Sequence, residues 1–339
     1  MALQFLMCID ADPDRPEYGG ARYDCPDKLT WNQLPALHKR LGKLRVEFKE
    51  RHSTQVKFTW FIRADLQIKQ VHGDAGWSAR NFAEMWDKVS KEGDELAWHP
   101  HAWRWSSSSN CWYNDIQDSD YIRESYDVGF EAFKEVMGYP PRASRAGINF
   151  HNNDSMRKLD ELGILTDLSG APGLKLFYAR PESGSPVPEG YDWSMAPSEP
   201  YRPSRDNYQK RAEGNDALRI LEIPMTTWRR PFLSPSHLAN MIPFDTYPRF
   251  RITRPPFKGW FVPTVWSDPS RFRRGLSEVI ERGKGGRALY GSSLHPDDIS
   301  DYTFARVRQN LELAVRMSEK RHVPLQFVTA GEAYISWNY

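Results

Sequence analysis

Short apolar runs alternate with amphipathic helical segments along almost the whole chain, and this alternation limits the possible folds more than any other feature. Residues 3–9 form a mostly apolar run of strand length, whereas residues 34–48 carry Leu and Phe at helical spacing among charged residues. Repetition of this pair predicts an α/β protein with a parallel sheet or barrel of seven or eight strands. We expect strands at residues 3–9, 56–62, 95–99, 142–147, 164–168, 218–224, 288–294 and 325–328. We expect helices at residues 34–48, 81–92, 119–137, 153–162, 270–281, 303–320 and 330–337.

Charge and composition exclude several classes of protein. Lys and Arg number 46 against 44 Asp and Glu, so nucleic acid is not an expected partner. No apolar run approaches the roughly 20 residues of a membrane span, and the N-terminal run reaches Asp10 too early for a signal-peptide core. We therefore expect a cytoplasmic protein. Cys8, Cys25 and Cys111 are odd in number and lack Cys-x-x-Cys spacing, which predicts thiols and no cysteine zinc site.

Two acids, Asp10 and Asp12, follow the first expected strand. Residues two apart on a strand point to one face, so one carboxylate could bind a metal while the other acts as a base. The alternative is a solvated acidic loop or a cap for the following turn. Asp-x-Asp is frequent, so this motif alone does not decide between them.

Two histidines, His99 and His101, follow the third expected strand among several tryptophans. The His-x-His spacing presents both imidazoles on one side, which suits two adjacent ligands of one divalent cation. Parallel α/β folds carry their chemistry at the carboxyl ends of the strands. We therefore expect the histidines to lie near the acids of the first strand.

Further polar residues occupy the ends of later strands. Arg145 could clamp a carboxylate with two hydrogen bonds, or form an ordinary salt bridge. Asp167 could orient a partner or a substrate hydroxyl. His295 ends a late strand, and its alternative is a helix-capping region, because Asp297 and Asp298 precede a helix. The shared strand-end position of all these residues predicts a single site.

In the order of these motifs the chain resembles the polysaccharide deacetylase family, also called the NodB-homology or carbohydrate esterase group. The family fold is an incomplete (β/α) barrel. Its Asp-Asp motif is similar to Asp10-Ala11-Asp12, and the resemblance implies that Asp10 is the base and Asp12 a metal ligand. The inserted Ala11 departs from the family pattern.

The resemblance extends to the histidine, arginine and late-strand motifs. The family binds its metal with His-Ser/Thr-x-x-His, whereas the residue four positions after His99 is Trp103, so the chain resembles a divergent branch in which His101 is the second ligand. Arg145 resembles the arginine that braces the base, and Leu294-His295 resembles the motif that supplies the acid. Residues 56–61 and 221–224 resemble two further strands of the family.

The resemblance implies metal-dependent hydrolysis of an N-acyl group, first of all an N-acetyl group, on an amino sugar or saccharide intermediate. One divalent ion, zinc first and otherwise cobalt, nickel or iron, would bind Asp12, His99 and His101. Asp10 would accept a proton from water, Arg145 would keep Asp10 charged, and His295 would protonate the leaving amine. We expect a carbohydrate or other small molecule as the substrate. The expected substrate-binding residues are Trp103, Trp105 and Asp167, with core packing as the alternative for the two tryptophans.

Two other functions stay open. One is hydrolysis of a non-sugar amide, such as a formamide or ureide, on the same fold. The other is a catalytically inactive carbohydrate-binding barrel, suggested by the missing second histidine of the family spacing. The sequence does not name the sugar, the acyl group, the oligomeric state or a role for His151.

Domain organisation follows from the position of the site. A length of 339 residues allows roughly two domains. Because residues from Asp10 to His295 have to meet in one site, we expect one barrel over residues 1–339. Residues 170–216 and 231–265 are rich in proline and show neither helical nor strand periodicity, so we expect long loop insertions there.

Overall fold

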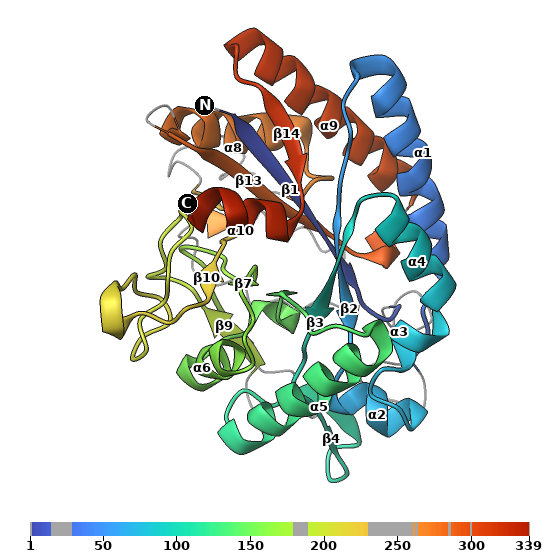
Figure 1. Ribbon diagram of the computed structural model, residues 1–339, viewed down its shortest axis with the longest axis vertical. Helices are drawn as coiled ribbons and strands as arrows, with labels where there is room; N and C mark the ends of the chain where they lie inside the picture. Colours follow the sequence, from blue (N-terminus) through green and yellow to red (C-terminus); the bar gives the residue numbers. More distant parts are fainter. Residues whose placement is uncertain are drawn as a thin grey trace, which may run out of the picture.

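The sheet collects strands from almost the whole length of the chain (Figure 1). The computed structural model describes residues 2–14, 29–178, 189–229, 260–261, 264–283, 286–298 and 300–338. Its main sheet contains eight strands, all paired in parallel. They are β1 (Leu3–Ala11), β2 (Thr59–Arg63), β3 (Glu95–His99), β6 (Ala143–Ser144), β7 (Thr166–Asp167), β10 (Leu221–Glu222), β13 (Ala288–Leu294) and β14 (Leu325–Val328). Each expected strand is therefore present, although several are shorter than expected.

The sheet curls into an incomplete barrel. Its strand order is β10-β7-β6-β3-β2-β1-β13, and β14 pairs with the first half of β1. The two outer edges approach each other just after β10, where the Thr226 N–H donates to the Gly291 carbonyl at 3.0 Å. This architecture confirms the expected distorted (β/α) barrel.

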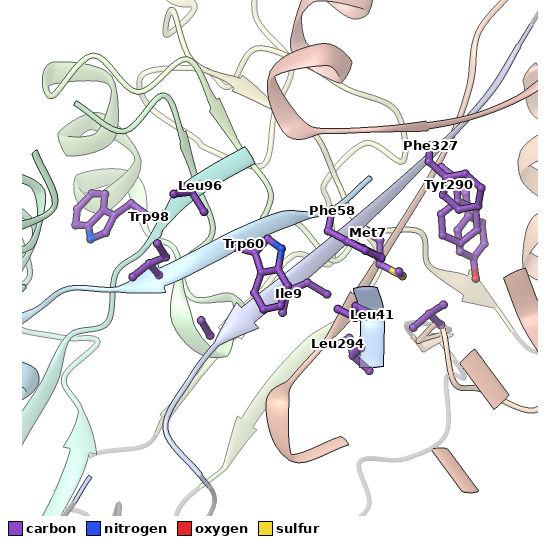
Figure 2. Close-up of a cluster of buried hydrophobic side chains, with 14 of the residues drawn as sticks. Met7, Ile9, Leu41, Phe58, Trp60, Leu96, Trp98, Tyr290, Leu294 and Phe327 are labelled. Atoms are coloured by element: carbon purple, nitrogen blue, oxygen red, sulfur yellow. The ribbon is translucent and has the colours of Figure 1, made fainter. Parts of the chain in front are cut away.

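Helices cover the outer face of the sheet (Figure 1). Alternate residues of each strand face these helices, and Figure 2 shows part of the resulting core, in which Met7 and Ile9 of β1 lie near Trp60 and Leu41. Within the described residues, the helices include the seven expected ones and two more. They are α1 (Leu34–His52), α2 (Leu66–His72), α3 (Trp77–Asn81), α4 (Ala83–Lys91), α5 (Ser119–Met137), α6 (Asn153–Glu161), α8 (Pro269–Arg282), α9 (Asp301–Arg321) and α10 (Ala330–Asn338).

The inner face of the barrel forms a second apolar cluster, which includes Leu6, Phe61 and Ala97. Helix α10 closes the end of the barrel where the strands begin. The Ala330 N–H donates to the hydroxyl oxygen of Thr59 at 2.9 Å, and the Gly331 N–H donates to the Glu95 carboxylate at 2.7 Å. The amino ends of the strands are thus sealed, and the carboxyl ends are left for polar side chains.

Several local features of the structure were not expected from the sequence. Helix α5 is capped by Asp118, whose carboxylate accepts the Tyr121 N–H at 3.0 Å. The short helices α2 and α3 were not expected, because 7 and 5 residues show too little helical period. The hairpin of β4 (Trp103–Ser106) and β5 (Cys111–Asn114) was also not expected.

The two proline-rich stretches differ in what the structure describes. The first contains an antiparallel hairpin of β8 (Lys175–Tyr178) and β9 (Glu189–Asp192), so it is not wholly irregular. Most of the second, residues 231–259, lies outside the described residues, as does Cys25. A short antiparallel pair of strands, β11 (Trp228–Arg229) and β12 (Trp260–Phe261), flanks residues 231–259.

Cys8 and Cys111 are thiols. No helix in the described part of the chain is long and apolar enough to cross a bilayer.

Candidate active site

Charged side chains continue the inward-facing rows of the strands at their carboxyl ends. On β1, Leu6 and Cys8 face the inner core, and Asp10 is the next residue of that row. On β2 and β3 the same two-residue step leads from Phe61 to Arg63 and from Ala97 to His99. Strand pairing is parallel, so these residues reach one end of the barrel together. Arg145 and His295 follow β6 and β13 and arrive at the same end.

Asp12, His99 and His101 form a compact buried cluster. Their side chains offer ligand atoms that all lie within 4.8 Å of one another. The two imidazole Nε2 atoms are 3.2 Å apart. Asp12 Oδ2 lies 3.5 Å from His99 Nε2, and Asp12 Oδ1 lies 3.4 Å from His101 Nε2. Asp12 is 7% exposed, His99 2% and His101 3%. Bulk water therefore has little access to these polar atoms.

The orientation of the two histidines fits metal binding. His99 Nδ1 donates to the backbone carbonyl of Arg145, which leaves Nε2 as the ring nitrogen that faces Asp12 and His101. His101 packs against Gly147 so closely that a Cβ there would lie 1.8 Å from His101 Cε1. Two nitrogens bound to one zinc at about 2.0–2.1 Å in tetrahedral geometry lie roughly 3.3 Å apart, close to the spacing of the two Nε2 atoms. The donor set of two imidazoles and one carboxylate therefore fits one divalent cation.

Protonation at the cluster also suits a cation. Burial would raise the pKa of the Asp12 carboxyl, but the neighbouring His99 and His101 outweigh burial and hold this pKa well below its ordinary value. Burial, together with the charge of Arg63, lowers the pKa of His101 well below its ordinary value. An ionised carboxylate and a neutral imidazole are the forms that bind metals.

Asp10 lies beside this cluster and is paired with a buried arginine. Both carboxylate oxygens of Asp10 accept from Arg145 Nε at 2.9 Å, while Arg145 Nη1 donates to the Leu168 carbonyl. Burial would lower the pKa of Arg145, but the charge of Asp10 outweighs burial and raises it. Arg145 thus contacts the Asp10 carboxylate through one N–H that both oxygens share, and its role toward Asp10 stays a prediction.

His295 connects the two acids to the surface. Its Nε2 lies 3.4 Å from Asp10 Oδ2 and 3.9 Å from Asp12 Oδ2, and its side chain is 27% exposed. Asp298 holds the other side of the residue, because its Oδ2 accepts the His295 backbone N–H at 3.1 Å and lies 3.5 Å from Nδ1. Helix α9 is capped by Ser300, so Asp298 serves His295 and not the helix.

Comparison with known proteins supports the architecture. No family model matches the chain, and no curated protein matches its sequence. Among solved structures, a protein of Parabacteroides distasonis provisionally assigned as a glycoside hydrolase/deacetylase is similar at a TM-score of 0.55 and 14% identity, over 99% of this chain and 71% of that one. The chain has the polysaccharide deacetylase fold. A polysaccharide deacetylase provisionally assigned in Pseudomonas aeruginosa PAO1 gives 0.52 and 14% (99% and 91% covered), and one from Mycobacterium smegmatis gives 0.50 and 15% (98% and 89% covered).

Within this polysaccharide deacetylase fold, the three residues expected to bind substrate have different surroundings. Trp103 is 1% exposed and stacks on His101, with ring centroids 5.8 Å apart, which favours a supporting role. Trp105 is half-buried and packs edge-on against Trp112. It is the one of the two expected tryptophans with accessible surface, so substrate contact stays a prediction for Trp105.

Asp167 lies in a buried polar network behind Arg145. Its carboxylate accepts the Ser144 hydroxyl at 2.7 Å and the Ser169 N–H at 2.9 Å, and it lies 3.2 Å from His151 Nε2. Asp167 is fully buried, which favours a role in positioning the Arg145 segment over contact with a substrate hydroxyl. His151 belongs to the same network.

Sequence reasoning missed Arg63 and Glu222. Arg63 is fully buried and donates to Asp12 at 2.9 Å. The sequence feature that could have indicated Arg63 is a cation at the end of an apolar strand, two residues after the inward-facing Phe61. Glu222 is also fully buried, and burial together with the charge of Asp167 raises its pKa well above the ordinary value. The corresponding indication in the sequence was a lone acid between the apolar residues Leu221 and Ile223.

Proposed function

We propose that this protein is a metal-dependent hydrolase that removes an N-acyl group from an amino sugar. The acyl group that we propose is N-acetyl. The observation that carries the proposal is the buried Asp12, His99 and His101 cluster beside Asp10 and His295. The fold agrees with this proposal, because similar solved structures are provisionally assigned as deacetylases.

Zinc is the ion we propose for the cluster, since it favours mixed nitrogen and oxygen ligands, and cobalt, nickel or iron suit the same donors. Such an ion supplies Lewis-acid chemistry when bound, polarising an acyl oxygen and acidifying water. His99 and His101 would hold it through Nε2, and Asp12 through a carboxylate oxygen.

Asp10 and His295 would move the protons. Arg145 pairs with and orients the buried Asp10 carboxylate, so Asp10 is placed to accept a proton from a water molecule. His295 lies on the same side, reaches solvent and would protonate the departing amine. Asp298 contacts Nδ1 of His295 and would stabilise its protonated form.

His101 bears on the alternative of an inactive carbohydrate-binding barrel. That alternative was based on the absence of a second histidine four residues after His99. The shorter His-x-His spacing nevertheless brings His101 Nε2 to 3.2 Å from His99 Nε2 and 3.4 Å from Asp12. This geometry favours a working metal site over a relic.

The test is an assay of the purified protein on N-acetylated amino sugars, with simple formamides and ureides as a second panel. We expect turnover of the sugars that a chelator abolishes and added zinc restores. Turnover that survives chelation would contradict the proposal, and turnover of the second panel alone would contradict the sugar substrate.

A double variant, His99→Ala/His101→Ala, tests the ligand set. We expect it to purify without the metal that the unchanged protein holds. His52→Ala/His322→Asn is the matched control, because these histidines lie at the ends of α1 and α9, outside the cluster. Asn tolerates the left-handed backbone of position 322, where φ is 53°. Metal retained by the first variant would overturn the proposed ligands.

A further inference from the structure

Arg63 is a fully buried cation at the tip of β2, next to the candidate metal cluster. It pairs in register with His99 on β3, so both side chains leave their strands at the same level of the barrel. A buried cation costs several kcal/mol unless its partners satisfy it. A role for Arg63 therefore has to be sought in what it contacts.

The guanidinium of Arg63 uses each of its three nitrogens. Nε donates to Asp65 Oδ2 at 2.7 Å, Nη1 to Asp12 Oδ1 at 2.9 Å and Nη2 to Gln67 Oε1 at 2.9 Å. Asp65 is itself fixed, because its Oδ1 accepts the Ile68 N–H as the cap of α2. The planar guanidinium thus joins Asp12 to the first turn of a helix through rigid geometry.

The two oxygens of Asp12 consequently differ. Oδ1 accepts from Arg63 and also lies 3.4 Å from His101 Nε2, whereas Oδ2 lies 3.5 Å from His99 Nε2 and 3.9 Å from His295 Nε2. Asp12 lies just beyond the end of β1, outside the sheet ladder that fixes Asp10. The Arg63 bond is therefore a main restraint on the rotation of this carboxylate.

We propose that Arg63 is a positioning residue of the metal centre, which holds the Asp12 carboxylate in the orientation that faces His99 and His101. The inference rests on the proposed function, since it concerns the ligand set of that site. A carboxylate that is already fixed in this orientation needs little further ordering when a metal binds. Arg63 acts through Asp12 and does not touch the substrate.

A role for Arg63 through charge alone predicts the opposite effect on metal affinity. A buried positive charge repels a divalent cation, so its removal would tighten metal binding. Loss of positioning weakens binding, because Asp12 then has to be ordered by the metal itself. A purely structural role would lower thermal stability and leave the affinity of the folded protein unchanged.

The experiment compares Arg63→Lys and Arg63→Met with the unchanged protein. Co²⁺ affinity is measured by competition with a chromophoric chelator, together with the visible spectrum of bound Co²⁺ and the melting temperature. Lys keeps a cation beside both carboxylates but cannot bridge three acceptors in a plane. We expect Arg63→Lys to fold, to bind Co²⁺ about 10- to 100-fold more weakly and to show an altered spectrum. Arg63→Met, where it folds, should bind at least as weakly.

Arg45→Lys is the matched control. Arg45 is largely buried and also bridges two acids, Glu92 and Asp94, but it lies outside the candidate cluster. Its replacement should lower the melting temperature without changing Co²⁺ affinity.

Unchanged affinity and spectrum in Arg63→Lys, or tighter binding in Arg63→Met, would overturn the inference. An unchanged protein that binds no Co²⁺ would instead contradict the proposed function. The two failures are therefore distinguishable.

Discussion

The two ends of the barrel are built on the same strands but hold opposite kinds of side chain. Toward the amino ends, the inward rows carry Leu6 and Ala97, and α10 packs over them. Toward the carboxyl ends, within a few residues, the rows carry Asp10, His99 and Arg63, all at most 2% exposed. One end is closed by apolar contact, and the other retains buried charge.

The two ends of the barrel differ in the free energy of burying their side chains. Apolar burial stabilises the protein by about 25 cal/mol per Å² without further requirements. Buried ions are unfavourable unless each has a partner. At the carboxyl end, Asp10 is held by Arg145 and Asp12 by Arg63. We infer that the closed end supplies stability and that the charged end is maintained for chemistry.

The largest expected effect is at the charged end. Asp10→Asn should lower kcat roughly 10²- to 10⁴-fold, because the base is lost, while the metal affinity stays unchanged because Asp10 is not among the ligands. Steady-state kinetics and metal titration on protein shown to be folded provide the measurement. Asp74→Asn, at an acid paired with Arg80, is the control. Activity that survives Asp10→Asn would place the base elsewhere.

The closed end should respond in stability alone. Leu6→Ala removes a fully buried side chain of the inner cluster and should lower the free energy of unfolding by about 2–5 kcal/mol. Urea denaturation measures this loss, and metal titration under folding conditions should show unchanged affinity. Weakened metal binding with little loss of stability would break the proposed division between the two ends.

A methyl group added at Gly147 should change the position of His101 without changing any charge. Gly147→Ala places a Cβ 1.8 Å from His101 Cε1, so His101 has to move. We expect at least about tenfold weaker metal binding, comparable to loss of a group that orients a ligand. Gly42→Ala is the control, since nothing lies within 4 Å of a Cβ at that position of α1. Equal affinity in the two variants would show that His101 is not a ligand.

The smallest expected effect concerns the buried acid pair behind Arg145. The raised pKa of Glu222 means that the folded protein keeps a proton that the unfolded chain releases above about pH 4.3. The contribution of Glu222 to stability therefore falls as pH rises from roughly 5 toward the folded pKa, by at most about 1.4 kcal/mol per pH unit. Glu222→Gln mimics the protonated form and should flatten this decline.

Urea unfolding at pH 5, 6, 7 and 8 measures the slope for both proteins. Gln offers an N–H toward Asp167 and an oxygen for the Gly170 N–H, so packing is preserved. A slope identical to that of the unchanged protein would mean that Glu222 is ionised in the fold.

The sequence predicts the architecture well where periodicity is long. Strands β3, β13 and β14 and helix α5 have the expected bounds, because four or more residues in each show a clear pattern. The hairpin β4–β5 was not predicted, since its Trp and Ser residues also fit a loop. Prediction therefore fails where the residue types of a short element fit a loop as well as a strand.

The site was predictable to the extent that strand ends determine it. Asp10, His99 and His295 meet because parallel strands end at one edge of the sheet. Arg63 could not be assigned, because its three acceptors come from two different elements that only the fold brings together. Gly147 carried no signal, since the close approach of His101 is a property of packing alone.

A metal centre formed by Asp12, His99 and His101 is tested most directly by metal content. The protein is saturated with zinc, excess ion is removed, and bound zinc is measured beside His99→Ala/His101→Ala treated identically. We expect one tightly bound ion per chain in the unchanged protein and none in the variant. An unchanged protein without bound metal, or equal metal content in both, would contradict this metal centre.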